Sequence, residues 1–249
     1  PVLSEEDIAN AANELLQALD ISVLHAVIGP SMGGMSALSF CQLHPGKAKR
    51  LISISSAARS SPFSIALRSL QREIIRNDPN WENGAYDLNG NGPISGMRLA
   101  RKLGMITYRS AKEWSARFGR ERAMEKDLKS GAFGVDFEIE SYLESHANKF
   151  IGAFDPNCYL YLSRAMDLFD ASDPDGNLEN SFKPLQLEEA LIIGVETDLL
   201  FPISQQAELA EALEKYVNKV RLVRLDSLQG HDSFLVDMDR FRPVISSFI

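Results

Sequence analysis

Val27-Ile28-Gly29-Pro30-Ser31-Met32-Gly33-Gly34-Met35 joins a short apolar run, residues 23–28, to an apolar segment of helical composition, residues 35–43. A G-x-S-x-G pattern between a strand and a helix predicts a nucleophile elbow, a sharp turn that exposes a serine. The turn strains the backbone of Ser31. We therefore expect a side chain at Gly29 or Gly33 to collide with the neighbouring strand or helix.

The helix that follows Ser31 adds a second catalytic feature. A helix N-terminus directs free N–H groups and the positive end of its dipole at a bound group. The backbone N–H of Met32 is thus predicted to form part of an oxyanion hole. The pattern is short, and the alternative is a glycine-rich turn with an idle serine.

Length and composition limit the functions that the chain can have. The 249 residues suffice for one large α/β domain or for a core with an inserted subdomain, and 45% of them are hydrophobic. The net charge of -8 and the lack of a basic cluster argue against binding to nucleic acid. No apolar run approaches the ~18–20 residues of a membrane span. Cys41 and Cys158 form no C-x-x-C pattern, which favours reduced thiols in a cytoplasmic protein without a metal site.

Helices and strands alternate in residues 1–60. A helix is predicted from the cap residue Ser4 to about residue 19, a strand at 21–28, a helix to about residue 44 and a strand at 50–55. This β-α-β order is typical of a parallel sheet flanked by helices.

The pattern becomes helical in residues 61–183. Polar, glycine-rich turns separate predicted helices at 65–75, 97–103, 111–118, 137–150 and 157–169. An independent helical domain is one interpretation. We favour a cap inserted into the sheet domain, because strand patterns resume in residues 184–249. These are a strand at 190–195, a helix at 202–216, a strand at 220–225 and a last helix from about residue 239.

Three reactive side chains follow the ends of predicted strands. Ser31, Asp198 and His231 would lie at the carboxyl edge of one parallel sheet, where open α/β sheets place active sites. The chain order Ser–Asp–His is typical of the α/β-hydrolase fold. His231 would take the proton of Ser31, and Asp198 would orient the imidazole. His25, His44 and His146 lack this setting; the alternative for His231 is a histidine of a surface loop.

The sequence resembles the homoserine O-acetyltransferase family of α/β-hydrolase-fold acyltransferases, and within it the serine O-succinyltransferase-like branch. The similarity covers nearly the whole chain, including the cap. The runs that carry it are residues 29–35, 72–81 (REIIRNDPNW), 98–108 (RLARKLGMITY), 137–143 (FEIESYL), 149–170, 198–202 and 230–234.

The resemblance implies a ping-pong O-acyltransferase. Ser31 would accept an acetyl or succinyl group from acetyl-CoA or succinyl-CoA, used as co-substrate with no bound cofactor. The hydroxyl of serine or homoserine would then take the acyl group, in methionine or cysteine biosynthesis, while the cap keeps water out. The residues 62–73 depart from the run typical of homoserine-specific members, so both acceptors stay open.

The resemblance also implies two substrate contacts. The family's arginine for the substrate carboxylate falls on Arg72, and a guanidinium suits a carboxylate because it binds both oxygens. The alternative for Arg72 is a solvated helix arginine beside Glu73. Asp232 could receive the substrate amino group; the alternative is a helix N-cap.

Two further expectations concern the whole protein. The family has strands before the point where this chain begins at Pro1, so these N-terminal strands of the fold are absent from this chain. We therefore expect the nucleophile strand to lie near a sheet edge. We expect the missing segment either to come from a separate polypeptide piece or simply to lie outside the structure. We also expect a homodimer. The competing functions are a serine esterase or thioesterase with the same triad, and a non-catalytic binding protein.

Overall fold

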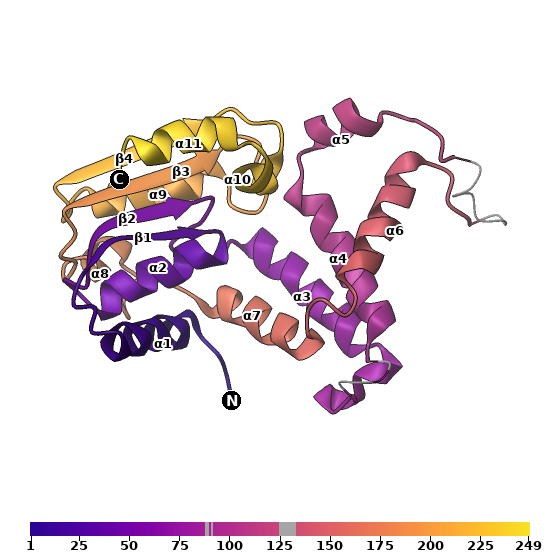
Figure 1. Ribbon diagram of the computed structural model, residues 1–249, viewed down its shortest axis with the longest axis horizontal. Helices are drawn as coiled ribbons and strands as arrows, with labels where there is room; N and C mark the ends of the chain where they lie inside the picture. The colour runs from indigo at the N-terminus through magenta and orange to yellow at the C-terminus, as the bar shows by residue number, and fades with distance from the viewer. Residues whose placement is uncertain (88–89, 91, 125–132) are drawn as a thin grey trace.

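A computed structural model describes residues 1–87, 90, 92–124 and 133–249 (Figure 1). The centre of the molecule is a parallel sheet. Within the described residues it contains β1 (Leu24–Pro30), β2 (Ala48–Ile54), β3 (Glu189–Val195) and β4 (Lys219–Leu225), in the order β1-β2-β3-β4. The strands predicted from the sequence are therefore present, and β1, which leads to Ser31, lies at an edge as expected.

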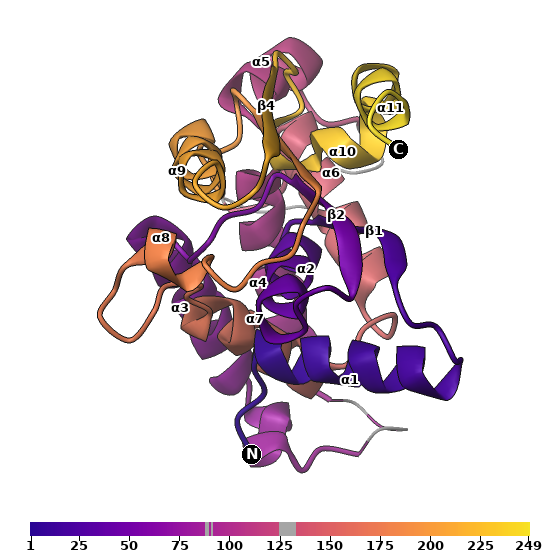
Figure 2. The ribbon, with the colours of Figure 1, turned by 90° about the vertical axis from the view of Figure 1, so that its left-hand side faces the viewer.

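Helices cover both faces of this sheet. The first face packs against α1 (Glu5–Ala18), α2 (Met32–Leu43) and α9 (Ile203–Leu213). The other face packs against α11 (Met238–Ser246), which lies across the sheet from α9 in Figure 2. Phe241 of α11 is buried against this face. Successive residues of a strand point to opposite faces, and both sets are buried from Leu51 onward in β2 and from Ala190 onward in β3. This burial explains the mostly apolar sequence of these strand segments, whereas Lys49 at the start of β2 is exposed.

The chain between β2 and β3 is helical in its described part. It contains α3 (Pro62–Arg76), α4 (Ile94–Tyr108), α5 (Ala111–Phe118), α6 (Glu138–Phe150), α7 (Pro156–Leu168) and the short α8 (Leu178–Ser181). Figure 1 shows α3 to α7 beside the sheet, on the side to which the strand arrows point. This arrangement places the helical segment over the carboxyl edge of the strands.

The helical segment has a small core of its own. Ile75, Met97 and Ala100 are buried together between α3 and α4. Leu178 and Phe182, in contrast, belong to the main core beneath the sheet. The end of the segment is therefore anchored to the sheet, while its middle extends from it.

Some short elements escaped prediction. The 3₁₀ turns at Pro79–Gly84 and Gly230–Asp232, and the one-turn helices α8 and α10 (Ser233–Val236), are too short for a helical period to appear in the sequence. β1 also begins three residues later than predicted and continues to Pro30, because Gly29 and Pro30 pair with β2. In the part of the chain that the structure describes, no helix has the length and apolar character needed to cross a membrane.

Candidate active site

The backbone of Ser31 has the strained conformation expected of a nucleophile elbow. Its φ of 53° and ψ of -123° lie where non-glycine residues are uncommon, at the junction of β1 and α2. A Cβ on Gly29 would lie 1.9 Å from the carbonyl oxygen of Gly33, so the expected collision at Gly29 is confirmed. The prediction of a collision at Gly33 is wrong, because the nearest neighbour of a Cβ added there would be 3.4 Å away. Gly34 is the crowded position instead, because a Cβ added there would lie 2.5 Å from Cβ of Ser56.

These distances predict different results for two similar substitutions. Gly29→Ala should lower the free energy of unfolding by about 1–3 kcal/mol or more, because backbone atoms of α2 must move. Gly33→Ala is the matched control and should preserve or raise stability, because alanine favours a helix over glycine by about 1 kcal/mol. Urea unfolding of the full-length protein measures both. Equal destabilisation by the two variants would contradict the assigned packing.

The side chains of Ser31, His231 and Asp198 form a hydrogen-bonded chain. Oγ of Ser31 lies 2.9 Å from Nε2 of His231, and Nδ1 of His231 lies 2.8 Å from Oδ2 of Asp198. His231 and Asp198 are each 4% exposed. The three residues follow the ends of β1, β3 and β4, so the structure brings together the residues predicted from strand order. This geometry suits a serine nucleophile with a histidine base.

Backbone and ring contacts hold the two supporting residues. Oδ1 of Asp198 accepts hydrogen bonds from the N–H groups of Leu200 (2.9 Å) and Phe201 (3.0 Å). The ring of Phe201 stacks on His231 at 5.3 Å, and Phe234 meets the imidazole edge-on at 5.5 Å. The carboxylate and the imidazole are therefore fixed relative to Ser31.

Met32 is the first residue of α2 and lines the same cavity as Ser31. The N–H groups of a first helical turn have no acceptor within their own helix. The position of Met32 is compatible with an oxyanion donor, and this role stays a prediction.

A cavity of about 380 Å³ opens above Ser31 and His231. The core supplies one wall, and α3, α4 and α7 supply the other. Its lining is largely apolar, but three charged side chains reach it: Arg68, Arg101 and Asp232. The site therefore offers two cations and one anion near the serine.

Arg101 has no hydrogen bond or ion pair among the described residues. Its guanidinium lies over the rings of Phe150 (4.6 Å) and Tyr108 (5.5 Å), and its Nε is buried without a hydrogen-bond partner. Aromatic faces hold such a cation in place while leaving its edge open to an anion. Arg101 lies in the run 98–108 that carries the family resemblance, but no local pattern in that run marks it as a functional residue.

Asp232 lies in the cavity as predicted. Its Oδ2 is 3.1 Å from Nε of Arg109, which lies outside the cavity lining. Burial raises the pKa of the Asp232 carboxyl above its ordinary value, and the charge of Arg109 opposes that rise. Asp232 precedes α10, but its side chain makes no capping hydrogen bond to that helix.

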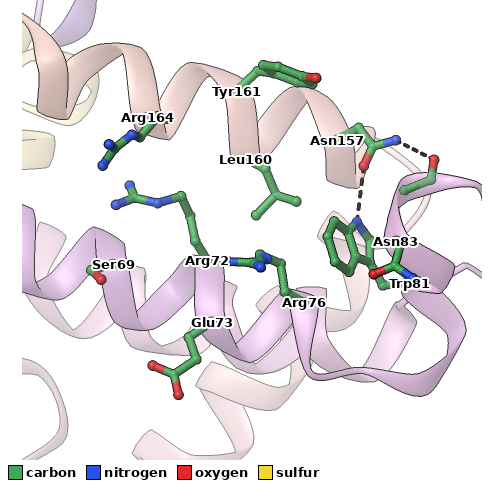
Figure 3. A pocket seen from close by; sticks show the side chains of 11 residues that line it. Ser69, Arg72, Glu73, Arg76, Trp81, Asn83, Asn157, Leu160, Tyr161 and Arg164 are labelled. Atoms are coloured by element: carbon green, nitrogen blue, oxygen red, sulfur yellow. Dashed lines mark hydrogen bonds between the residues drawn. The ribbon is translucent and has the colours of Figure 1, made fainter. Parts of the chain in front are cut away.

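The structure places Arg72 in a different cavity from Ser31. This second cavity, of about 650 Å³, lies between α3 and α7 and is shown in Figure 3. Arg72 points from α3 toward α7, where Nη1 donates to Oγ of Ser163 (2.8 Å) and Nη2 pairs with Oδ2 of Asp167 (2.6 Å). The carboxylate role of Arg72 stays a prediction, and its observed contacts are those of a residue that joins two helices.

Comparisons with known proteins agree with this geometry. The α/β-hydrolase fold family matches residues 3–237. A serine O-succinyltransferase of Stenotrophomonas maltophilia (strain K279a) is 52% identical over the whole chain, which spans 67% of that relative. A homoserine O-acetyltransferase from Bacillus anthracis superposes with a TM-score of 0.88 at 24% identity, over the whole chain and 65% of that structure. Esterase E22 superposes with a TM-score of 0.86 at 29% identity, over the whole chain and 67% of that structure.

The chain thus spans about two thirds of the length of the relatives it matches. Its similarity extends through the triad and the helical segment alike, as the sequence runs predicted. The chain belongs to the α/β-hydrolase fold family and, within it, to the acyltransferases represented by the serine O-succinyltransferases.

Proposed function

We propose that the protein moves an acyl group from an acyl-CoA thioester to the hydroxyl of serine or homoserine, through an ester on Ser31. The succinyl donor and the serine acceptor are favoured, because the relatives at about 52% identity are named serine O-succinyltransferases. The same proposal assigns a biosynthetic role in the cytoplasm.

The first half-reaction acylates the enzyme. His231 takes the proton of Ser31 as Oγ attacks the thioester carbonyl, and the N–H of Met32 stabilises the oxyanion. The carbon–sulfur bond then breaks, and CoA leaves with the proton from His231. Asp198 stabilises the imidazolium that forms between these two transfers.

The second half-reaction uses the same groups in reverse. The acceptor hydroxyl gives its proton to His231 and attacks the acyl carbon on Ser31. The ester to Ser31 breaks, its Oγ recovers the proton, and the acylated amino acid leaves. Each half-reaction therefore returns His231 to its starting state.

The charges in the cavity are the observation that carries the proposal. An amino acid acceptor presents a carboxylate and an ammonium group beside its hydroxyl. Arg101, which has no described anionic partner, suits the carboxylate, and Asp232 suits the ammonium group. A neutral ester would leave Arg101 without a counter-ion and would make no use of Asp232, whose described partner is Arg109. The helical segment over the cavity would also exclude water, which competes with the acceptor.

An esterase or thioesterase is the second candidate, because esterase E22 is 29% identical with a TM-score of 0.86. The test incubates the full-length protein with succinyl-CoA and acetyl-CoA, with serine and homoserine in competition, and identifies products by mass spectrometry. We expect acylated amino acid, and only one CoA per active site when the acceptor is omitted. Continuous CoA release to free acid, equal with and without acceptor, would contradict acyl transfer.

Arg101→Lys should weaken the acceptor half-reaction selectively. Lysine keeps the charge but loses the two-pronged contact to a carboxylate, so kcat/KM for the acceptor should fall by about 10- to 100-fold. The burst of CoA release without acceptor should persist. Arg72→Lys is the matched comparison, since it tests the alternative arginine in the neighbouring cavity. If kcat/KM for the acceptor falls more in Arg72→Lys than in Arg101→Lys, the acceptor carboxylate is bound by Arg72 instead.

A further inference from the structure

We propose that Arg68 forms a subsite for the distal carboxylate of a dicarboxylic acyl group, such as succinyl, both on the donor and on the acylated Ser31. The inference rests on the proposed function and adds a choice of donor to it. Arg68 lies on α3 and lines the cavity that also contains Ser31 and His231.

The guanidinium of Arg68 is held in a fixed orientation. Nε donates to Oδ1 of Asp167 at 2.6 Å, and Nη2 donates to Oγ of Ser60 at 2.5 Å. The Ser60 hydroxyl donates onward to the carbonyl oxygen of Met166 at 2.7 Å, so its oxygen is free to accept from the arginine. Among the described residues no hydrogen bond occupies Nη1 of Arg68. A fixed guanidinium with donors to spare suits recognition of a carboxylate.

The charges around Arg68 do not balance within the described protein. Asp167 pairs with both Arg68 and Arg72, and these three side chains are 2%, 7% and 13% exposed, respectively. The other described acceptors of Arg72 are the neutral hydroxyl and carbonyl oxygens of Ser163. The cluster therefore contains two cations and one anion. A buried excess charge is costly without a counter-ion, and a bound carboxylate would supply one.

The cavity contains two arginines, and we assign the carboxylate that binds Arg68 to the acyl donor. The acceptor amino acid has one α-carboxylate, for which Arg101 is open, while its ammonium group faces Asp232. An acetyl group has no charge, so it would leave the excess positive charge of the cluster of Arg68, Arg72 and Asp167 without a counter-ion. A succinyl group carries a carboxylate at the far end of its four-carbon chain. The carboxylate of the succinyl group would then pair with Arg68, and the carboxylate of the acceptor with Arg101.

The apolar surroundings of Arg68 strengthen the preference for a succinyl group over an uncharged acyl group. Leu67, Leu162 and Met166 line the same cavity as Arg68, so an acyl group bound there would lie among apolar side chains as well as beside the guanidinium. An ion pair in such an environment is stronger than in water, and an uncharged acyl group gains nothing comparable.

The first test changes the donor and leaves the protein intact. Butyryl-CoA has the same four carbons as the succinyl group but no carboxylate. Rapid-quench measurement of CoA release, without acceptor, should give a second-order rate constant of acylation for butyryl-CoA at least about 10-fold below that for succinyl-CoA. Equal rates for the two donors would overturn the subsite. Continuous hydrolysis of both thioesters would instead contradict the proposed acyltransferase, so the two failures are distinguishable.

The second test changes Arg68. Arg68→Gln should reduce acylation by succinyl-CoA about 10- to 100-fold, while acylation by acetyl-CoA stays within a few-fold and the acceptor KM is unchanged. Ser60→Ala is the matched control that removes one support of the guanidinium and keeps its charge, so its effect on succinyl transfer should be smaller. Arg68→Lys should recover part of the succinyl preference. Parallel losses with both donors in Arg68→Gln, or a rise in acceptor KM alone, would overturn the assignment.

Discussion

Ser31→Ala should abolish acyl transfer by the full-length protein, with a loss of roughly 10⁴–10⁶-fold in kcat. In the proposed mechanism the hydroxyl oxygen carries the acyl group, and this oxygen lies 2.9 Å from Nε2 of His231. Water or the acceptor could still attack the thioester directly, but without the covalent step. The expected residual rate therefore comes from binding and from the oxyanion donor alone.

Two measurements check this result. Steady-state CoA release gives the loss in rate, and the intact mass of the protein after mixing with succinyl-CoA shows whether an acyl adduct forms. The wild type should gain one acyl group and Ser31→Ala none, with unchanged circular dichroism. An alanine variant that retains most of its acyl transfer would disprove the covalent mechanism.

Asp198→Asn should cost about 10⁴-fold in kcat while leaving the fold intact. The amide oxygen of asparagine can replace Oδ1 and keep the hydrogen bonds from the N–H groups of Leu200 and Phe201. The amide NH₂ group would then take the place of Oδ2 and donate to Nδ1 of His231. The imidazole would be forced to carry its proton on Nε2, so it could no longer accept the proton of Ser31.

The matched control for this substitution is Asp226→Asn. Asp226 is also a carboxylate just past the end of a strand, β4, but it is exposed. Its variant should keep wild-type kcat, and thermal unfolding should show that both variants fold. Equal activity of Asp198→Asn and the wild type across pH 6–9 would remove Asp198 from the mechanism.

The triad was predictable because three signals in the sequence coincide. Ser31, Asp198 and His231 each follow a strand-like apolar run, and parallel strands bring their carboxyl ends to one edge. The distances of 2.8 and 2.9 Å then follow from the elbow and from the contacts that hold Asp198. For such a site, chain order and strand ends are sufficient to name the residues.

The arginines of the cavity were not predictable in the same way. Arg68 and Arg72 lie one helical turn apart on α3, and both reach Asp167, yet only Arg68 lines the cavity of Ser31. Helical periodicity does not show which partner helix covers which part of a face. That depends on how α3, α4 and α7 pack together. These helices are far apart in the sequence, so no local sequence pattern indicates their packing. The same limit applies to Gly33 and Gly34, whose difference depends on the approach of Ser56.

The helical segment enters the fold after β2 and leaves it before β3, two strands that are neighbours in the sheet. Changes in the middle of this segment, residues 62–168, can therefore occur without moving β1, β3 or β4, after which the reactive groups lie. In the proposed mechanism, selection can then change which molecule receives the acyl group while the covalent step is inherited unchanged.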